Sequence, residues 1–245
     1  MKTINVAMIG VSAALYAIVG VLTNMGIVSP VVGVVKFWPA VIVPAIFAVL
    51  FGPWVGGIGA AIGIFVSDMV QPGHGIILLS LTVGSTSNFA MFFLIGWISK
   101  RNMNWRNMVI ALIVGSSLLT GMMSYLFAIE SISIDILALF LGVLYASVAI
   151  VIGVGLWKPN SKSYGLASVV GLFVGSTIIG FGLWGYSQFL TLPLTGFERN
   201  APVYASFLWL VWTFATEIPF LVTIVPPVVK ICYKAFPSLV LKPEK

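Results

Sequence analysis

The sequence predicts an all-α integral membrane protein with about eight transmembrane helices, and three observations support this. Sixty per cent of the 245 residues are hydrophobic and only 7% are charged, whereas a soluble domain usually carries about 25% charged residues. Apolar runs long enough to cross a bilayer recur along the whole chain. The basic residues fall in short segments between these runs. Such a chain cannot build a water-facing surface, so the bilayer is its expected solvent.

Eight apolar segments are expected to form the helices. The second and third are short and are separated only by Gly52-Pro53, where proline cannot continue a helix. They are expected to form either a tight helical hairpin or two helices that span incompletely. The segments are Ile4–Asn24, Phe37–Phe51, Trp54–Met69, Ile76–Ser99, Met108–Phe127, Ile134–Trp157, Tyr164–Tyr186 and Tyr204–Val225.

The distribution of charge predicts the orientation in the membrane. If Lys2 is cytoplasmic and the segments alternate, ten of the twelve Lys and Arg residues lie inside, and only Lys36 and Arg199 lie outside. This positive-inside pattern predicts a multi-pass protein of the cell membrane with cytoplasmic N- and C-termini. The basic residues are dispersed over short loops and form no stripe, so no nucleic-acid partner is expected.

Several kinds of chemistry find no support in the sequence. With one cysteine, Cys232, and one histidine, His74, the chain can form no internal disulfide and no site of several Cys and His ligands. It contains no phosphate-binding G-x-x-x-x-G-K-[ST] loop, no G-x-S-x-G and no H-E-x-x-H. We therefore expect no enzyme activity, no cofactor and no metal, and a membrane-embedded enzyme is the weakest alternative.

Small residues predict close helix contacts in the first three segments. Ala13 and Ala17 share one face of the first helix, and small residues at this spacing let another helix approach closely. That helix belongs either to this chain or to a partner. Two Gly-x-x-x-Gly pairs, within 52–56 and 59–63, predict tight backbone contact along the hairpin.

These features resemble the substrate-binding subunit, or S component, of an energy-coupling factor (ECF) transporter. The resemblance rests on Ala13-x-x-x-Ala17, on the Pro-rich start of the second helix followed by residues 51–59 (FGPWVGGIG), and on a Gly-rich third helix ending at Ser67-Asp68. It covers roughly the first hundred residues. Members of this family usually have about six helices.

The resemblance implies one polytopic domain over residues 1–245. Residues 1–157 would form an S-component-like core of six helices, and residues 158–245 would add two helices and a basic cytoplasmic tail. The resemblance further implies that Ala13 and Ala17 contact a coupling transmembrane subunit, that a pair of separate ATPase subunits supplies the energy, and that the substrate is a small organic solute such as a vitamin or a vitamin precursor.

Five residues, expected at the outer face or in the outer half of the membrane, are candidates for binding the substrate. Lys36 breaks the positive-inside trend, so it either holds an anionic group of a ligand or is a surface lysine. The buried amide of Asn88, expected ~18 Å below the outer end of its helix, needs a partner from a neighbouring helix or from a ligand. The five candidates are Lys36, Trp38, Asp68, Ser87 and Asn88.

Glu217 is an acid in the middle of the last apolar segment, where an ionisable residue is a functional hypothesis by default. In an S component with its site in the outer half, Glu217 is expected to lie too deep to touch the ligand. The alternative function is a stand-alone secondary transporter or channel that uses Glu217 for proton or cation coupling.

Overall fold

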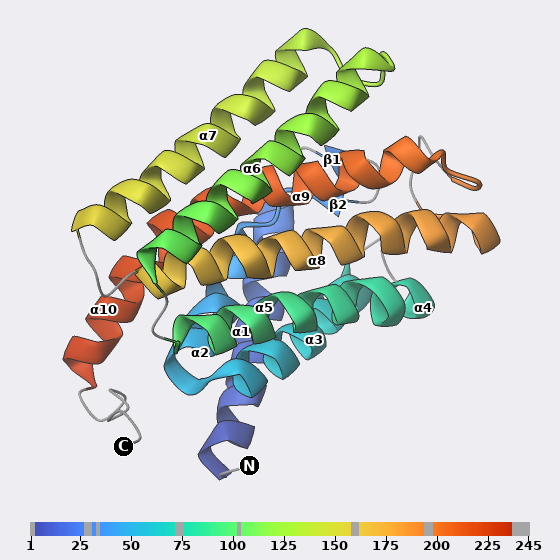
Figure 1. Cartoon of the computed structure of the whole chain (residues 1–245). Coiled ribbons are helices and arrows are strands. Elements are labelled where there is room, and N and C mark those ends of the chain that lie inside the picture. Colours follow the sequence, from blue (N-terminus) through green and yellow to red (C-terminus); the bar gives the residue numbers. More distant parts are fainter. Residues whose placement is uncertain are drawn as a thin grey trace.

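The computed structural model describes residues 3–26, 31–32, 35–71, 76–101, 104–157, 162–193 and 198–236, which form a helical bundle (Figure 1). A two-stranded antiparallel hairpin follows the first helix, with Val31 opposite Lys36. The elements in chain order are α1 (Thr3–Gly26), β1 (Val31–Val32), β2 (Val35–Lys36), the 3₁₀ turn η1 (Pro39–Val41), α2 (Ile42–Phe51), α3 (Pro53–Val70), α4 (Ile77–Leu79), the π-helical η2 (Ser80–Ser85), α5 (Thr86–Ser99), α6 (Trp105–Ala128), α7 (Ile134–Trp157), α8 (Lys162–Phe189), α9 (Val203–Thr223) and α10 (Val225–Ala235).

Within the described residues, seven apolar helical stretches are long enough to cross a bilayer, which agrees with a multi-pass all-α membrane protein. α4, η2 and α5 together form one of them, and α9 with α10 forms another. The expected second segment is instead a shorter apolar helix, Pro39–Phe51. The count of eight spans is therefore not confirmed.

Gly52 separates α2 from α3, as the Gly52-Pro53 pair predicts. Its φ of 108° lies in the region that favours glycine, and Pro53 begins the next helix. A Cβ at Gly52 would lie 3.0 Å from Nζ of Lys100, which follows the end of α5. α2 and α5 therefore end at the same end of the bundle.

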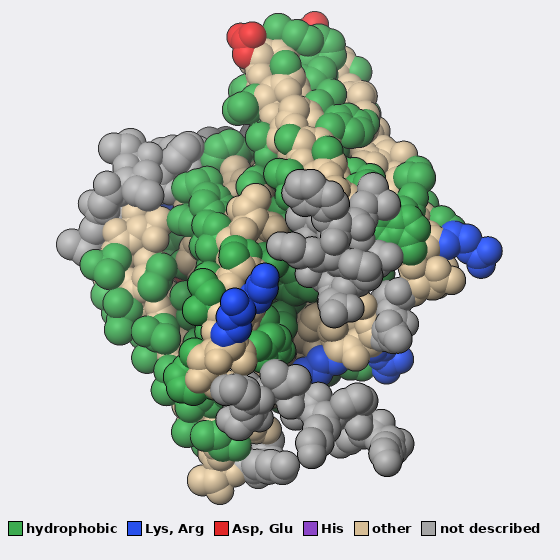
Figure 2. Space-filling model, turned by 90° about the vertical axis from the view of Figure 1, so that its left-hand side faces the viewer, with side chains coloured by type: hydrophobic (Ala, Val, Ile, Leu, Met, Phe, Trp, Pro, Cys, Tyr) green, Lys and Arg blue, Asp and Glu red, His purple; other side chains and the backbone are tan. Residues whose placement is uncertain are grey.

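The connections of the helices gather at two opposite ends. In Figure 1 the α5–α6 and α7–α8 connections and α10 lie at the left, whereas α4 and the α8–α9 connection lie at the right. Figure 2 faces the left-hand end and shows Lys and Arg side chains at several places on it. Of the basic residues expected on that side, Lys2, Lys158, Lys242 and Lys245 lie outside the described residues.

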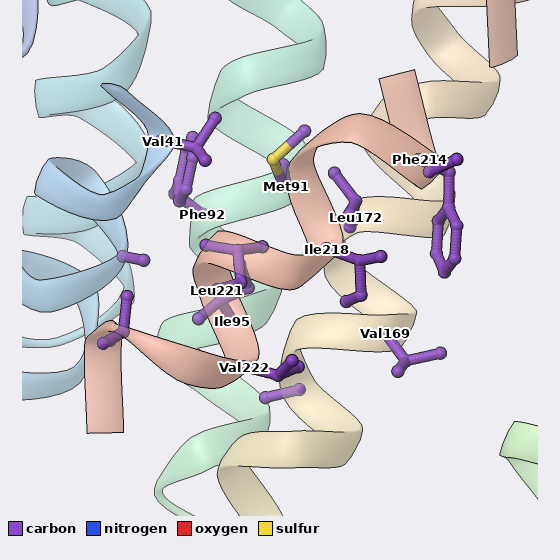
Figure 3. Packing of buried hydrophobic residues seen from close by; sticks show 14 of the residues in the cluster. Val41, Met91, Phe92, Ile95, Val169, Leu172, Phe214, Ile218, Leu221 and Val222 are labelled. Carbon is purple, nitrogen blue, oxygen red and sulfur yellow. The ribbon is translucent and has the colours of Figure 1, made fainter. Parts of the chain in front are cut away.

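The centre of the bundle is formed by α5, α8 and α9; α2 and α3 pack on α5, and α1 packs on α3. Figure 3 shows Ile95 of α5, Leu172 of α8, and Ile218 and Leu221 of α9 converging in one apolar cluster. The α6–α7 pair lies on the other side of α8 and α9 (Figure 1) and exposes many large apolar side chains, as expected of lipid-facing helices. α8 and α9 therefore lie inside the bundle. The expected division into a core of residues 1–157 and two added helices in residues 158–245 remains a prediction.

Glycines of α3 make the close helix contacts that their spacing predicts, although with two different partners. A Cβ at Gly56 would lie 2.3 Å from Cβ of Ala48 in α2. At Gly63 it would lie 2.8 Å from the carbonyl oxygen of Ala13, and at Gly59 it would lie 2.8 Å from Ser12, both in α1. α3 is thus held between α2 and α1 through its small residues.

Candidate functional site

A cavity of about 130 Å³ lies where the hairpin, α1, α3, η2, α5, α8 and α9 meet. Apolar side chains of the β2, α3, α4, α5 and α8 regions cover much of its wall. Polar groups are added by nine residues: Tyr16, Lys36, Trp38, Asp68, Gln71, Ser80, Ser87, Asn88 and Glu217. All five residues that the sequence nominates for substrate binding are therefore in this one lining.

Tyr16 and Asn88 form the centre of a hydrogen-bonded chain along one wall. The Tyr16 hydroxyl donates to Oδ1 of Asn88 at 2.7 Å and accepts from Nε1 of Trp38 at 2.9 Å. Nδ2 of Asn88 donates to the carbonyl of Gly84 at 2.9 Å. The Tyr16 ring also makes edge-to-face contacts with Trp38 and Phe92. These contacts fix the aromatic wall before any ligand binds.

A second polar group joins the hairpin to the end of α3. Nζ of Lys36 donates to Oε1 of Gln71, whose Nε2 donates to Oγ of Ser67 at 2.7 Å. Burial lowers the pKa of Lys36 below its ordinary value, and the charge of Asp68 opposes this effect. Lys36 thus donates to an amide and lies within electrostatic reach of a carboxylate, and it is half-buried rather than free on the surface.

Asp68 is linked to the π-helical stretch η2. Oγ of Ser80 donates to Oδ2 of Asp68 at 2.6 Å. A Cβ at Gly84 would lie 3.3 Å from the same oxygen, so the absence of a side chain leaves room for the carboxylate. π-Helical turns are rare and are frequent at functional sites. This one carries Ser80, Val83 and Gly84 into the lining of the cavity.

Ser87 also lines the cavity, but its hydroxyl donates to the carbonyl of Gly84 at 2.9 Å. The residue is fully buried, so in this structure its hydroxyl group shapes the wall and has no surface open to a ligand.

Glu217 lies in the lining as well, against the expectation that it would be too deep to reach this site. α8 has 28 residues, which is about 42 Å at 1.5 Å per residue, longer than a hydrocarbon core of about 30 Å. In Figure 1 the ends of α8 and α9 that meet at the α8–α9 connection extend to the right beyond α4. Because α8 and α9 extend beyond α4, a residue in the middle of α9 can lie level with the cavity residues of α5.

The carboxyl group of Glu217 contains a buried oxygen atom without a hydrogen-bond partner among the described residues. This atom is Oε2, and the residue is only 4% exposed. A buried polar group without a partner costs about 1–3 kcal/mol, and more when it is charged. Such a group in a native structure calls for an explanation.

Ala13 and Ala17, expected at a partner interface, are buried within the chain. The Ala13 backbone faces Gly63 of α3. In this conformation their methyl groups are unavailable to another subunit, and the interpretation of this face as internal packing is favoured. The neighbouring pair, Gly10 and Ala14, is exposed instead.

The sequence did not single out Tyr16, Gln71 or Ser80 as individual ligand-binding candidates. Tyr16 directly precedes Ala17 on the buried face of α1. A polar aromatic residue beside the small residues of a helix-packing face could have marked it as a candidate. Gln71 has no such signal, because its role depends on the hairpin returning to the end of α3.

The cavity suits a small organic molecule better than a bare ion or a long chain. An apolar cavity of about 150 Å³ holds benzene, so a cavity of about 130 Å³ is of the size that suits a single ring. Apolar walls with a few fixed polar groups are typical of sites for small molecules.

Comparisons with known proteins identify no relative of this chain. The chain matches no family model, and searches of curated proteins and of solved structures find no match either.

Proposed function

We propose that this protein captures a small organic solute in the membrane, as the substrate-binding S component of an ECF-type importer. The cavity carries this proposal, because it brings Lys36, Trp38, Asp68, Ser87 and Asn88 together in a wall that is otherwise apolar. A coupling transmembrane subunit and a pair of ATPases would supply the energy. We further propose that the chain crosses the cell membrane eight times, with the region 37–51 making one short crossing, and that both termini are cytoplasmic.

Mass spectrometry of small molecules retained on the purified chain tests the capture function. Wild type should retain one compound in a near-stoichiometric amount. Leu183→Trp should lose it, because Leu183 of α8 lines the cavity and an indole there fills the space. Leu139→Trp on the exposed face of α7 is the matched control and should retain the compound. Equal retention by both variants would remove the cavity from the proposal.

A second candidate function is a stand-alone carrier coupled to protons or cations, and the buried, unpartnered carboxyl of Glu217 favours it. Proteoliposomes that contain only this chain separate the two functions. Accumulation of the retained compound, driven by a pH or sodium gradient without ATP and lost in Glu217→Gln, would favour the carrier. Uptake that requires ATP and the co-reconstituted ATPase and coupling subunits would favour the S component.

A further inference from the structure

The polar groups of the cavity differ in how completely the chain itself satisfies them. At the hairpin, Lys36 donates to Gln71, and Asp68 accepts from Ser80. Oε2 of Glu217 is buried and has no partner among the described residues. The carboxyl group of Glu217 is therefore an acceptor of the lining that a ligand can satisfy without breaking an existing bond.

The distribution of charged residues in the lining also indicates the Glu217 carboxyl group as the ligand contact. The charged residues that line the cavity are Lys36 from β2, Asp68 from α3 and Glu217 from α9. Lys36 and Asp68 interact electrostatically, which leaves Glu217 as the acid without a counter-charge among the described residues of the lining.

The elements packed around Glu217 supply no cation from the described lining. From α1, Tyr16 shares the lining with Glu217, but its hydroxyl proton is directed to Asn88. α8 contributes Ile179 and Leu183, which are apolar. A carboxylate in such surroundings is stabilised by a cation that also donates a hydrogen bond.

We propose that Glu217 recognises the positively charged nitrogen of a single-ring organic solute. This inference rests on the proposed capture function and names the class of its substrate. The volume of about 130 Å³ accommodates one ring. The rings of Tyr16 and Trp38 form an aromatic wall beside which an organic cation is also favoured. The ammonium or protonated ring nitrogen donates to the carboxyl group of Glu217, and the ring lies against the apolar side chains.

Three probes that share one ring test this charge preference: benzylamine, benzyl alcohol and benzoate. Isothermal titration calorimetry is carried out on the full-length chain after removal of any retained compound, with detergent-matched blanks for each probe. Wild type should bind benzylamine at least about tenfold more tightly than either of the others, which corresponds to 1.4 kcal/mol. Glu217→Gln keeps the shape of the side chain and should abolish this preference. Glu130→Gln, which changes an exposed acid at the end of α6, should preserve it.

Two results would overturn the inference. One is that benzyl alcohol or benzoate binds wild type as tightly as benzylamine, or that the preference persists in Glu217→Gln; the cavity would then remain a binding site without selectivity for cations. The other is that no probe binds. The affinities of wild type for the three probes test the preference for a cation even if Glu217→Gln does not fold. Mass spectrometry of the retained compound tests the capture function independently.

Discussion

The Tyr16 hydroxyl and Oδ1 of Asn88 lie 2.7 Å apart, and this hydrogen bond joins α1 to α5 across 72 residues of sequence. Tyr16→Phe keeps the ring but leaves Oδ1 of Asn88 and Nε1 of Trp38 without this partner. Buried groups that lose a partner cost about 1–3 kcal/mol. We expect the free energy of unfolding, measured by titration with a denaturing detergent, to fall by this amount.

Tyr145→Phe is the matched control for this loss. The Tyr145 hydroxyl also has a hydrogen bond, at 2.9 Å to Oγ1 of Thr120, but both residues are on the α6–α7 pair and the contact is exposed. Its removal should change the stability by less than about 1 kcal/mol. Equal losses in the two variants would mean that the cavity wall is not held together by Tyr16.

The sequence predicts which residues share a helix face better than it predicts where that face points. The break at Gly52-Pro53 follows from local chemistry, and it lies where expected. The spacing of Ala13 and Ala17 fixes their common face, but α3 covers that face, which only the tertiary packing determines. Similarly, the acid at Glu217 is evident from the sequence, whereas its place in the cavity depends on how far the α8–α9 end extends.

The two neighbouring alanines of α1 should respond in opposite ways to a large side chain. Ala13 is buried beside Gly63, so Ala13→Trp forces an indole into a close helix contact. We expect this variant to aggregate or to unfold at lower temperature in a fluorescence-detected size-exclusion assay. Ala14 is exposed, and Ala14→Trp should leave the isolated chain as stable as wild type. A stable Ala13→Trp protein would show that α1 can turn or shift away from α3.

Two glycines in helices give a second pair of opposite expectations. At Gly56 a Cβ would lie 2.3 Å from Cβ of Ala48 and 2.7 Å from its Cα, so Gly56→Ala requires α2 and α3 to move apart. At Gly121 of α6 a Cβ would meet nothing within 4 Å, and alanine is a better helix former than glycine by about 1 kcal/mol. Thermal unfolding should therefore occur at lower temperature for Gly56→Ala, and at the same or higher temperature for Gly121→Ala. A stabilised Gly56→Ala protein would contradict the close packing of α2 on α3.

The proposed orientation can be tested at the two ends of the bundle. Asn104 begins α6 at the end where α5 finishes, and Glu198 lies in the α8–α9 connection at the opposite end (Figure 1); both are exposed. The chain contains a single cysteine, Cys232, so Cys232→Ser gives a background without reactive thiols. In intact cells a membrane-impermeant maleimide should label Glu198→Cys, and it should label Asn104→Cys only after the membrane is permeabilised. This follows because Lys100, Arg101 and Arg106 flank Asn104, and basic loops are retained in the cytoplasm.

Labelling of Asn104→Cys from outside would invert the proposed topology and would place the cavity end of α3 toward the cytoplasm, which is incompatible with capture of an external solute.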